Sequence, residues 1–227
     1  MKIIKKIIFF IILVSIITVT VLFFSGYKLY KNKLEEINFL EQIETIRSSE
    51  YFTKKEDMAT QYVDAVLAAE DHRFYDHGPI DVIAIIRAIY TNIKELDFVE
   101  GGSTITQQVA KNVFFTGEET ATRKIAEMFM AYKLEKNYSK DDIFEIYVNT
   151  SYFGSGYYSI KEASEGYYDK EPKELTLSEA AMLAGIPNAP GVYDLNVNPD
   201  LAKQRQKIVI NKMIRHGYLT EEEAKIW

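Results

Sequence analysis

An uncharged apolar run near the N-terminus constrains this chain more than any other feature. Residues 7–26, IIFFIILVSIITVTVLFFSG, contain no charged side chain. A helix of about 20 apolar residues, rising about 1.5 Å per residue, matches the ~30 Å hydrocarbon core of a bilayer. The sequence therefore predicts one membrane-spanning helix over residues 7–26, preceded by a short tail of residues 1–6.

A cleaved signal peptide is the alternative interpretation of this run. The apolar region of a signal peptide is about 7–15 residues long and is followed by a small-x-small cleavage site. This run is longer and no such site follows it, which favours an uncleaved anchor. The positive-inside rule does not decide the orientation, because three lysines precede the run and three follow it: Lys2, Lys5, Lys6, Lys28, Lys31 and Lys33.

The rest of the chain is predicted to be a helical domain on a stalk. Residues 34–57 are charged and lack a sustained apolar face, which is typical of a stalk. We therefore expect a juxtamembrane stalk over residues 27–57 and the folded domain over residues 58–227. No alternating strand pattern is bounded by hairpin turns, so we expect a mainly α fold. Four helix-start signals of the type Ser/Thr-x-x-acid/Gln precede apolar-periodic runs. They are Thr104 with Gln107, Ser139 with Asp142, Thr176 with Glu179, and Thr220 with Glu223.

Composition excludes several classes of function. The chain has no cysteine, which rules out disulfides, Cys-ligated metal centres and thiol catalysis. Six of the 27 basic residues are lysines in residues 1–33, which hold no acid, so residues 34–227 carry 21 basic and 33 acidic side chains. Because nucleic acid is a polyanion, we expect no nucleic-acid partner for so acidic a domain.

The first candidate for chemistry is the segment AAEDHRFYDHG. Glu70 follows Leu67 by three residues and Val66 by four, so it continues their apolar stripe, whereas Asp71 turns away from it. Burial raises the pKa of a carboxyl group, which suits proton transfer from a sugar hydroxyl near neutral pH. The alternative is a core glutamate paired with Arg73 or with a backbone group.

Two histidines of the same segment are weak candidates for a metal site. His72 and His77 are five residues apart and no third ligand stands at a typical spacing. We therefore favour histidines at a helix end or in a loop, and predict no protein metal site.

The second candidate is the segment GGSTITQQVAKN. Gly101 and Gly102 permit close backbone approach, and Thr104 with Gln107 then opens a helix. The free N–H groups of a helix start favour an anion. Amides and one ammonium follow on two adjacent helix faces, which suits a ligand rich in hydroxyls and phosphate: Gln107, Lys111, Gln108 and Asn112. The alternative is an ordinary capped surface helix.

The third candidate is the segment RKIAEMFMAYKLEK. Arg123 and Glu127 stand at i, i+4 beside Lys124, which predicts an ion pair on one helix. This pair could be a solvated surface pair. It could equally be buried in a cleft wall, because Met130 and apolar neighbours flank the same face. The run MFMAY suits either the core or an apolar patch beside the bilayer.

Together these segments resemble the peptidoglycan glycosyltransferases, glycosyltransferase family 51, which occur as monofunctional enzymes and as the first domain of bifunctional penicillin-binding proteins. The likeness covers about residues 60–215. It is carried by the motifs Glu70, Asp71, Phe74 and His77; residues 101–112; Arg123, Lys124 and Glu127; Tyr147, Asn149 and Gly154; residues 179–190; and Asn198, Pro199 and Arg205. The resemblance implies a lysozyme-like α-helical domain with a smaller jaw lobe near the membrane.

The resemblance also implies an activity and roles for residues. Family members join lipid II units into β-1,4-linked glycan strands and release undecaprenyl diphosphate. Glu70 would be the general base, and Glu127 the second catalytic residue, orienting the donor diphosphate. Residues implied in substrate binding are Asp71, Phe74, Ser103, Thr104, Gln107, Gln108, Lys111, Asn112, Arg123 and Lys124. Magnesium often assists in the family.

Location and partners follow from the same resemblance. The tail would be cytoplasmic, the anchor would cross the bacterial cytoplasmic membrane once, and the domain would lie on the outer face. Lipid II, the growing glycan strand and other cell-wall synthesis proteins are the expected partners. No Ser-x-x-Lys and Lys-Thr-Gly pair of a transpeptidase is present, which indicates a monofunctional chain or a fragment ending at the junction.

Two positions depart from the family pattern. Pro79 stands where members usually have glycine, and Glu119 stands where a basic residue is common. An acidic side chain at a phosphate-binding position leaves open a non-catalytic scaffold that binds lipid II. A lysozyme-like enzyme that cleaves glycan, with Glu70 as acid, is a further alternative, against which the intact second and third motifs argue.

Overall fold

The chain folds almost entirely into helices, as a mainly α fold predicts. The computed structural model describes residues 2–96, 101–118 and 120–226, and these residues contain no strand. The expected departure at Glu119 lies outside the described residues. The α-helices are α1 (Lys2–Glu36), α2 (Phe39–Arg47), α3 (Thr60–Glu70), α4 (Val82–Glu95), α5 (Ile105–Phe114), α6 (Ala121–Asn137), α7 (Lys140–Val148), α8 (Ile160–Tyr168), α9 (Leu177–Gly185), α10 (Pro190–Tyr193) and α11 (Pro199–Arg215). Short 3-10 helices are η1 (Lys55–Asp57), η2 (Pro172–Glu174), η3 (Ile186–Asn188) and η4 (Glu223–Ile226).

The predicted helix starts are confirmed by reciprocal side-chain to backbone hydrogen bonds. Capping boxes begin α5, α7 and α9, where Thr104, Ser139 and Thr176 are the N-cap residues. The fourth pair also forms, because Glu223 accepts from the Thr220 amide at 2.9 Å, but only the 3-10 helix η4 follows it. Each box satisfies backbone N–H groups that lack a partner inside the helix, so these boundaries are determined locally.

The core lies between two groups of helices. Helices α3, α9 and α11 pack on one another, and α5 packs on both α6 and α7. Large side chains such as Phe144, Phe153 and Met130 are fully buried between them. Removing one such side chain from water stabilises the fold by about 1.5–3 kcal/mol. The two groups join where α3 ends and α5 begins, because Asp71, which follows α3, accepts a hydrogen bond from the backbone amide of Ile105 at 3.1 Å.

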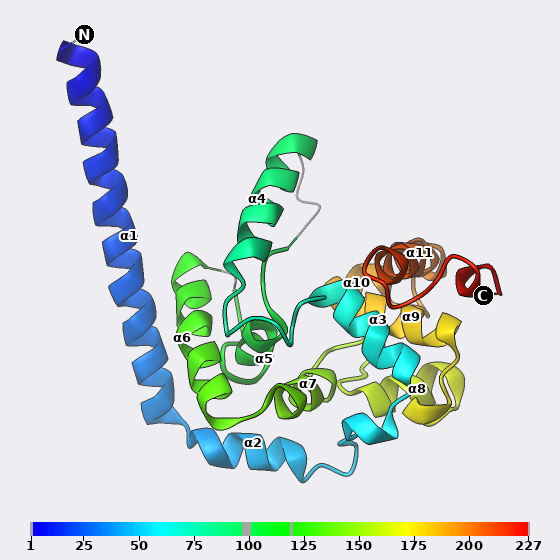
Figure 1. Cartoon of the computed structure of the whole chain (residues 1–227). Helices are drawn as coiled ribbons and strands as arrows, with labels where there is room; N and C mark the ends of the chain where they lie inside the picture. The colour runs from blue at the N-terminus through cyan, green and yellow to red at the C-terminus, as the bar shows by residue number, and fades with distance from the viewer. Residues whose placement is uncertain (1, 97–100, 119, 227) are drawn as a thin grey trace.

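Helix α1 is longer than the apolar run that predicts it. It continues as far as Glu36, and its C-terminal half lies along α6, while its N-terminal half stands clear of the domain (Figure 1). By length and composition α1 is able to cross a membrane.

The structure corrects the expectation of a stalk lacking an apolar face. Phe39 and Ile43 of α2 are buried in the main core, and Ile46 is partly buried against it. The Phe39 ring stacks on Phe114 of α5 with centroids 5.5 Å apart. These apolar residues lie at i, i+4 and i+7, a single narrow stripe that the surrounding charges obscure in the sequence.

Helix α4 projects from the body of the domain toward the same side as the free end of α1 (Figure 1). Ala88 is the one buried residue of α4. Its apolar side chains lie mainly on one face and are exposed: Val82, Ile83, Ile86, Ile89, Tyr90 and Ile93. This arrangement matches the small projecting lobe that the sequence resemblance implies.

Candidate active site

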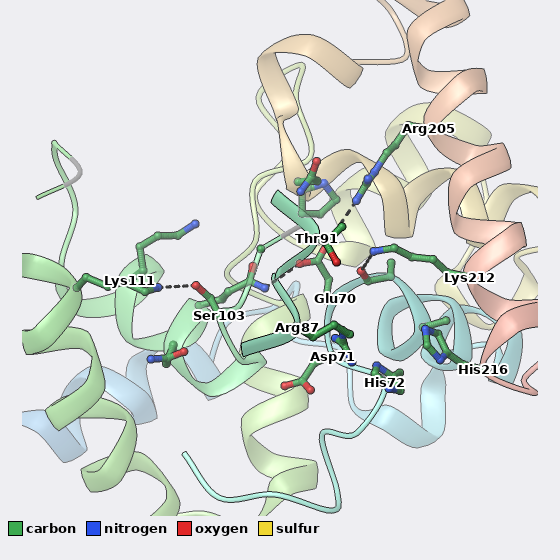
Figure 2. Close-up of a pocket in the computed structure, with 18 of the residues that line it drawn as sticks. Glu70, Asp71, His72, Arg87, Thr91, Ser103, Lys111, Arg205, Lys212 and His216 are labelled. Carbon is green, nitrogen blue, oxygen red and sulfur yellow. Dashed lines mark hydrogen bonds and ion pairs between the residues drawn. The ribbon is translucent and has the colours of Figure 1, made fainter. Parts of the chain in front are cut away.

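A cleft of about 1020 Å³ opens where α3, α4, α5, α6 and α11 converge. Figure 2 shows Glu70 between two walls, with Ser103 and Lys111 on one side and Arg205 and Lys212 on the other. Most of the residues that the sequence singles out meet here: Glu70, Asp71, Ser103, Gln107, Gln108, Lys111, Arg123 and Lys124.

Glu70 is the last residue of α3 and holds a nearly buried carboxylate at the cleft. Its Oε2 accepts a hydrogen bond from Nε2 of Gln108 at 2.7 Å, and its Oε1 lies 4.0 Å from a guanidinium nitrogen of Arg205. Oε1 accepts no hydrogen bond from the described residues. Oε1 is buried, but Glu70 belongs to the lining of the cleft, and a carboxylate oxygen with unused acceptor capacity there is able to receive a proton from a bound hydroxyl group.

Two buried tyrosines lie behind Glu70 and do not compete for this role. Burial raises the pKa of Tyr62 and Tyr147, and the negative charge of Glu70 raises both further. These phenols therefore stay protonated. Of these three groups, the Glu70 carboxylate is the one that lines the cleft.

The pairing of Glu70 with Arg73, the alternative considered from the sequence, is wrong. Arg73 instead binds Asp81 through two nitrogens, at 2.7 and 3.2 Å. Asp81 also accepts from the amides of Ile83 and Ala84 and so caps α4. Because Arg73 is paired with Asp81, it does not neutralise Glu70, and this favours the interpretation of Glu70 as a site residue.

Asp71 turns away from the apolar stripe, as predicted, but it is buried rather than solvated. One carboxylate oxygen accepts from Nε2 of His77 at 2.8 Å, and the other from the backbone amide of Ile105 at 3.1 Å. A carboxylate at the first turn of α5 is favoured by the helix dipole. Asp71 thus fastens the end of α3 to the start of α5, which positions Glu70 against Gln108.

Within the described residues, one cluster has three side chains near enough to hold a metal ion. Ligand atoms of Asp71, His77 and Asp81 lie within 4.8 Å of one another. The carboxylate oxygens already accept the hydrogen bonds described above, and one candidate ligand is an imidazole. Because Mg²⁺ prefers an octahedron of oxygen ligands, this cluster does not fit magnesium.

The third sequence motif forms a buried ion cluster at the opposite wall. Glu127 is 1% exposed and lies 3.0 Å from Nε of Arg123 and 3.1 Å from Nζ of Lys124. Lys124 also donates to Oγ of Ser103 at 2.6 Å. The solvated surface pair is therefore wrong, and the pair in a cleft wall is the arrangement observed. Arg123 and Lys124 reach the cleft, with Glu127 behind them.

Four predicted site residues do not line the cleft. Thr104 is the buried N-cap of α5, and Phe74 is buried in the core. Glu127 supports the two cations in front of it, and Asn112 lies outside the lining. The contact of these four residues with substrate stays a prediction. In the structure, Thr104, Phe74 and Glu127 support a helix start, the core and the two cations, respectively.

Sequence reasoning assigned no site role to one wall of the cleft, although Arg205 is among the motif residues that carry the family resemblance. Arg205, Lys212, Arg215 and His216 come from α11 and its C-terminal end, and Arg87 and Thr91 come from α4. Lys212 donates to the backbone oxygen of Ala69 at 2.6 Å, next to Glu70. The spacing of Arg205 and Lys212 at i, i+7 places them on one helix face, but charged residues on such a face are usually solvated.

The cleft is basic although the domain is acidic. Seven lysines and arginines line it, against the two carboxylates Glu70 and Asp71. Walls of one charge sign with low-dielectric surroundings concentrate ligands of the opposite sign. The site therefore suits an anionic ligand, a property that the net charge of −6 conceals.

His72 and His216 stack at one end of the cleft, with ring centroids 3.8 Å apart. Burial lowers the pKa of His216 to about 4, assisted by His72, Arg87, Arg215 and Lys212. Burial and Arg87 also lower the pKa of His72. Both rings are thus neutral at pH 7.

We expect this pair to make the fold acid-sensitive. A lowered folded-state pKa gives stability that is complete above about pH 6.5 and is lost as the pH falls toward about 4, because the unfolded chain takes up the proton first. His216→Phe keeps a stacked ring and removes this titration. Urea midpoints measured from about pH 7 to about pH 4 should fall more steeply for the wild type. Parallel curves would contradict the expectation.

A helical domain with a basic cleft around a buried carboxylate suits glycosyl transfer, and comparison with known proteins shows which family it belongs to. The family model described as Transglycosylase matches residues 36–214. The chain belongs to this family, as a peptidoglycan glycosyltransferase related to bifunctional penicillin-binding proteins.

Two curated relatives illustrate the likeness. The chain is 46% identical to penicillin-binding protein 1A of Neisseria flavescens over 172 residues, which are 76% of this chain and 22% of that protein. It is also 46% identical to penicillin-binding protein 1F of Bacillus subtilis over 168 residues, 74% of this chain and 24% of that protein. The chain thus spans about a quarter of the length of these relatives.

Proposed function

We propose that this chain polymerises lipid II into β-1,4-linked glycan strands and releases undecaprenyl diphosphate. The observation that carries the proposal is that Glu70 lines one cleft together with Lys111 of α5 and the cations of α6. Figure 2 shows Lys111 apart from Glu70 on the other side of the site. A base on one side and cations on the other match the two charge changes of glycosyl transfer, at the attacking hydroxyl and at the leaving group.

Each wall then has a part in the reaction. Glu70 accepts the proton of the acceptor 4-hydroxyl as its oxygen attacks C1 of the donor sugar. The bond from C1 to the diphosphate oxygen breaks, and the diphosphate leaves with the electron pair, which inverts the α-linkage to β. Lys111, Arg123 and Lys124 stabilise the charge that develops on the diphosphate. Glu127 holds Arg123 and Lys124 in position.

Magnesium is proposed only as an ion bound to the donor diphosphate. The cluster of Asp71, His77 and Asp81 does not suit it, so no step is assigned to a protein-bound ion. The cleft's own cations supply the positive charge that the diphosphate needs.

Two exposed apolar surfaces support a location at the membrane. Helix α1 suits a membrane crossing, and the apolar face of α4 projects toward the same side. An amphipathic helix with such a face lies favourably in the boundary between headgroups and acyl chains. We propose one crossing of the cytoplasmic membrane, the domain on its outer face, and access to a lipid-linked donor from the bilayer. Other cell-wall synthesis proteins stay proposed partners.

Contact of α4 with the bilayer is testable with single labels, because the chain has no native cysteine. A polarity-sensitive dye on Ile89→Cys, on the apolar face of α4, should be quenched by nitroxide lipids several-fold more than the same dye on Glu165→Cys. Residue 165 is exposed on α8, which Figure 1 shows well apart from α4. Equal quenching at the two positions in reconstituted vesicles would contradict the contact.

Polymerisation is tested with purified full chain in detergent, lipid II and magnesium, with products separated by gel. Polymer formation is the expected result. Binding of lipid II without polymer would favour a scaffold of the same fold. Shortening of preformed glycan strands without consumption of lipid II would favour a lysozyme-like hydrolase.

A further inference from the structure

Helix α6 lies between the anchor helix and the cleft. On one face it packs against α1, and it also packs against α5, which bears Gln108 and Lys111. Thr122, Ile125 and Phe129 stand at i, i+3 and i+7 and share the face toward α1. Arg123, Lys124 and Glu127 lie on the rest of the helix circumference, toward the cleft.

The contact between α1 and α6 requires a glycine. Gly26 is buried in α1, and a Cβ atom there would lie 2.6 Å from Cβ and Cγ2 of Ile125 and 3.0 Å from the backbone oxygen of Thr122. Two of these atoms belong to the stiff, branched base of the Ile125 side chain and the third to the backbone, so a side chain at position 26 must displace one helix from the other.

An aromatic clasp lies one turn further along the same interface. The ring of Phe129 packs edge-on against Phe23 and Tyr27, with centroids 5.3 and 5.2 Å away, and stacks on Tyr30 at 5.7 Å. The three rings of α1 stand at i, i+4 and i+7, on the same face as Gly26. Together the glycine contact and the clasp determine both the distance and the rotation between the helices.

We infer that Gly26 and Phe129 are positioning residues that couple the anchor helix to the cations of the site. The inference rests on the proposed function, because it concerns how Arg123 and Lys124 meet the donor diphosphate. A displaced α6 carries both cations with it, along with the hydrogen bond from Lys124 to Ser103. Displacements of about 1 Å at a catalytic group reduce rates by up to about 10²-fold.

The test compares Gly26→Leu with Val21→Leu in the full chain. Val21 is on α1 and is 58% exposed, so the control adds bulk without entering the interface. Gly26→Leu should lower kcat/KM for lipid II about tenfold or more and weaken binding of undecaprenyl diphosphate about tenfold. Val21→Leu should match the wild type. Equal behaviour of the two variants would overturn the inference, as would loss of thermal stability alone with kinetics unchanged below the unfolding transition.

A swap of side chains checks that the effect arises at this contact. Gly26→Ala should weaken undecaprenyl diphosphate binding, and adding Ile125→Gly, which removes the obstructing atoms, should recover most of the loss. Losses that simply add would overturn the coupling. Phe129→Ala should resemble Gly26→Leu, and Tyr132→Ala, an exposed aromatic of the same helix, should not.

Hydrogen exchange separates this inference from the proposed function, because it needs no substrate. Amides of residues 123–127 should exchange faster in Gly26→Leu than in Val21→Leu. An inactive wild type that still shows this difference would refute the polymerase and retain the coupling. Identical exchange would refute the coupling whatever the activity.

Discussion

Replacing Glu70 by glutamine is expected to lower the rate of lipid II polymerisation by about 10²–10⁴-fold, the usual contribution of a general base. Glutamine keeps the size of the side chain and an oxygen that is able to accept from Gln108, but it takes up no proton at neutral pH. The initial rate of polymer formation at saturating lipid II measures the effect. Binding of lipid II should change little.

Glu135→Gln is a matched control for this experiment. Glu135 is also a largely buried glutamate, hydrogen-bonded to Thr106 at 2.7 Å and paired with Lys140 at 2.7 Å, and it does not line the cleft. Its replacement should leave the rate close to that of the wild type. A Glu70→Gln protein that polymerises at the wild-type rate, or equal losses in both variants, would remove Glu70 from the role of base.

Replacing Arg123 by methionine is expected to destabilise the domain by about 3 kcal/mol, because it leaves the charge of Glu127 buried with one partner fewer. This value lies at the low end of the usual range, because Lys124 still reaches Glu127. The melting temperature should fall by about 6–12 °C. Turnover should fall as well, since the substitution removes a cation that the proposed mechanism places against the donor diphosphate.

A second substitution separates these two effects. Adding Glu127→Leu to Arg123→Met removes the buried charge altogether, and apolar replacement of a buried ion pair is often neutral for stability. The double variant should therefore melt close to the wild type while its polymerisation stays low. Recovery of both properties would show that the ion cluster acts only on folding.

The site could be predicted from sequence where its residues are near one another in the chain. Arg123, Lys124 and Glu127 are within one helical turn or so, and their spacing alone predicts the ion pairs that the structure contains. The capping box of Thr104 and Gln107 is equally local. The spacing of residues in a helix predicts which face each one occupies. For these groups, sharing a face is sufficient to predict the contact.

The wall formed by α11 could not be predicted in this way. Arg205 and Lys212 reach Glu70 and Ala69 across more than 130 residues of sequence. Their spacing within α11 does not distinguish them from solvated surface cations, and the motif that contains Arg205 indicated the family but no place in the site. Only the packing of α11 on α3 brings both residues to the cleft. Similarly, the burial of Asp71 depends on His77 and on the first turn of α5.

The sequence by itself determined the membrane-suited helix, the mainly α character, the helix starts and the order of motifs that indicates the family. These properties depend on residues within a few positions of each other, or on composition. Tertiary structure decided the docking of α2, the contact of Gly26 with Ile125, the basic cleft within an acidic domain and the partners of Glu70. Each of these arises between segments far apart in the chain, and such contacts depend on how the helices pack on one another, which the spacing of residues within a single helix does not determine.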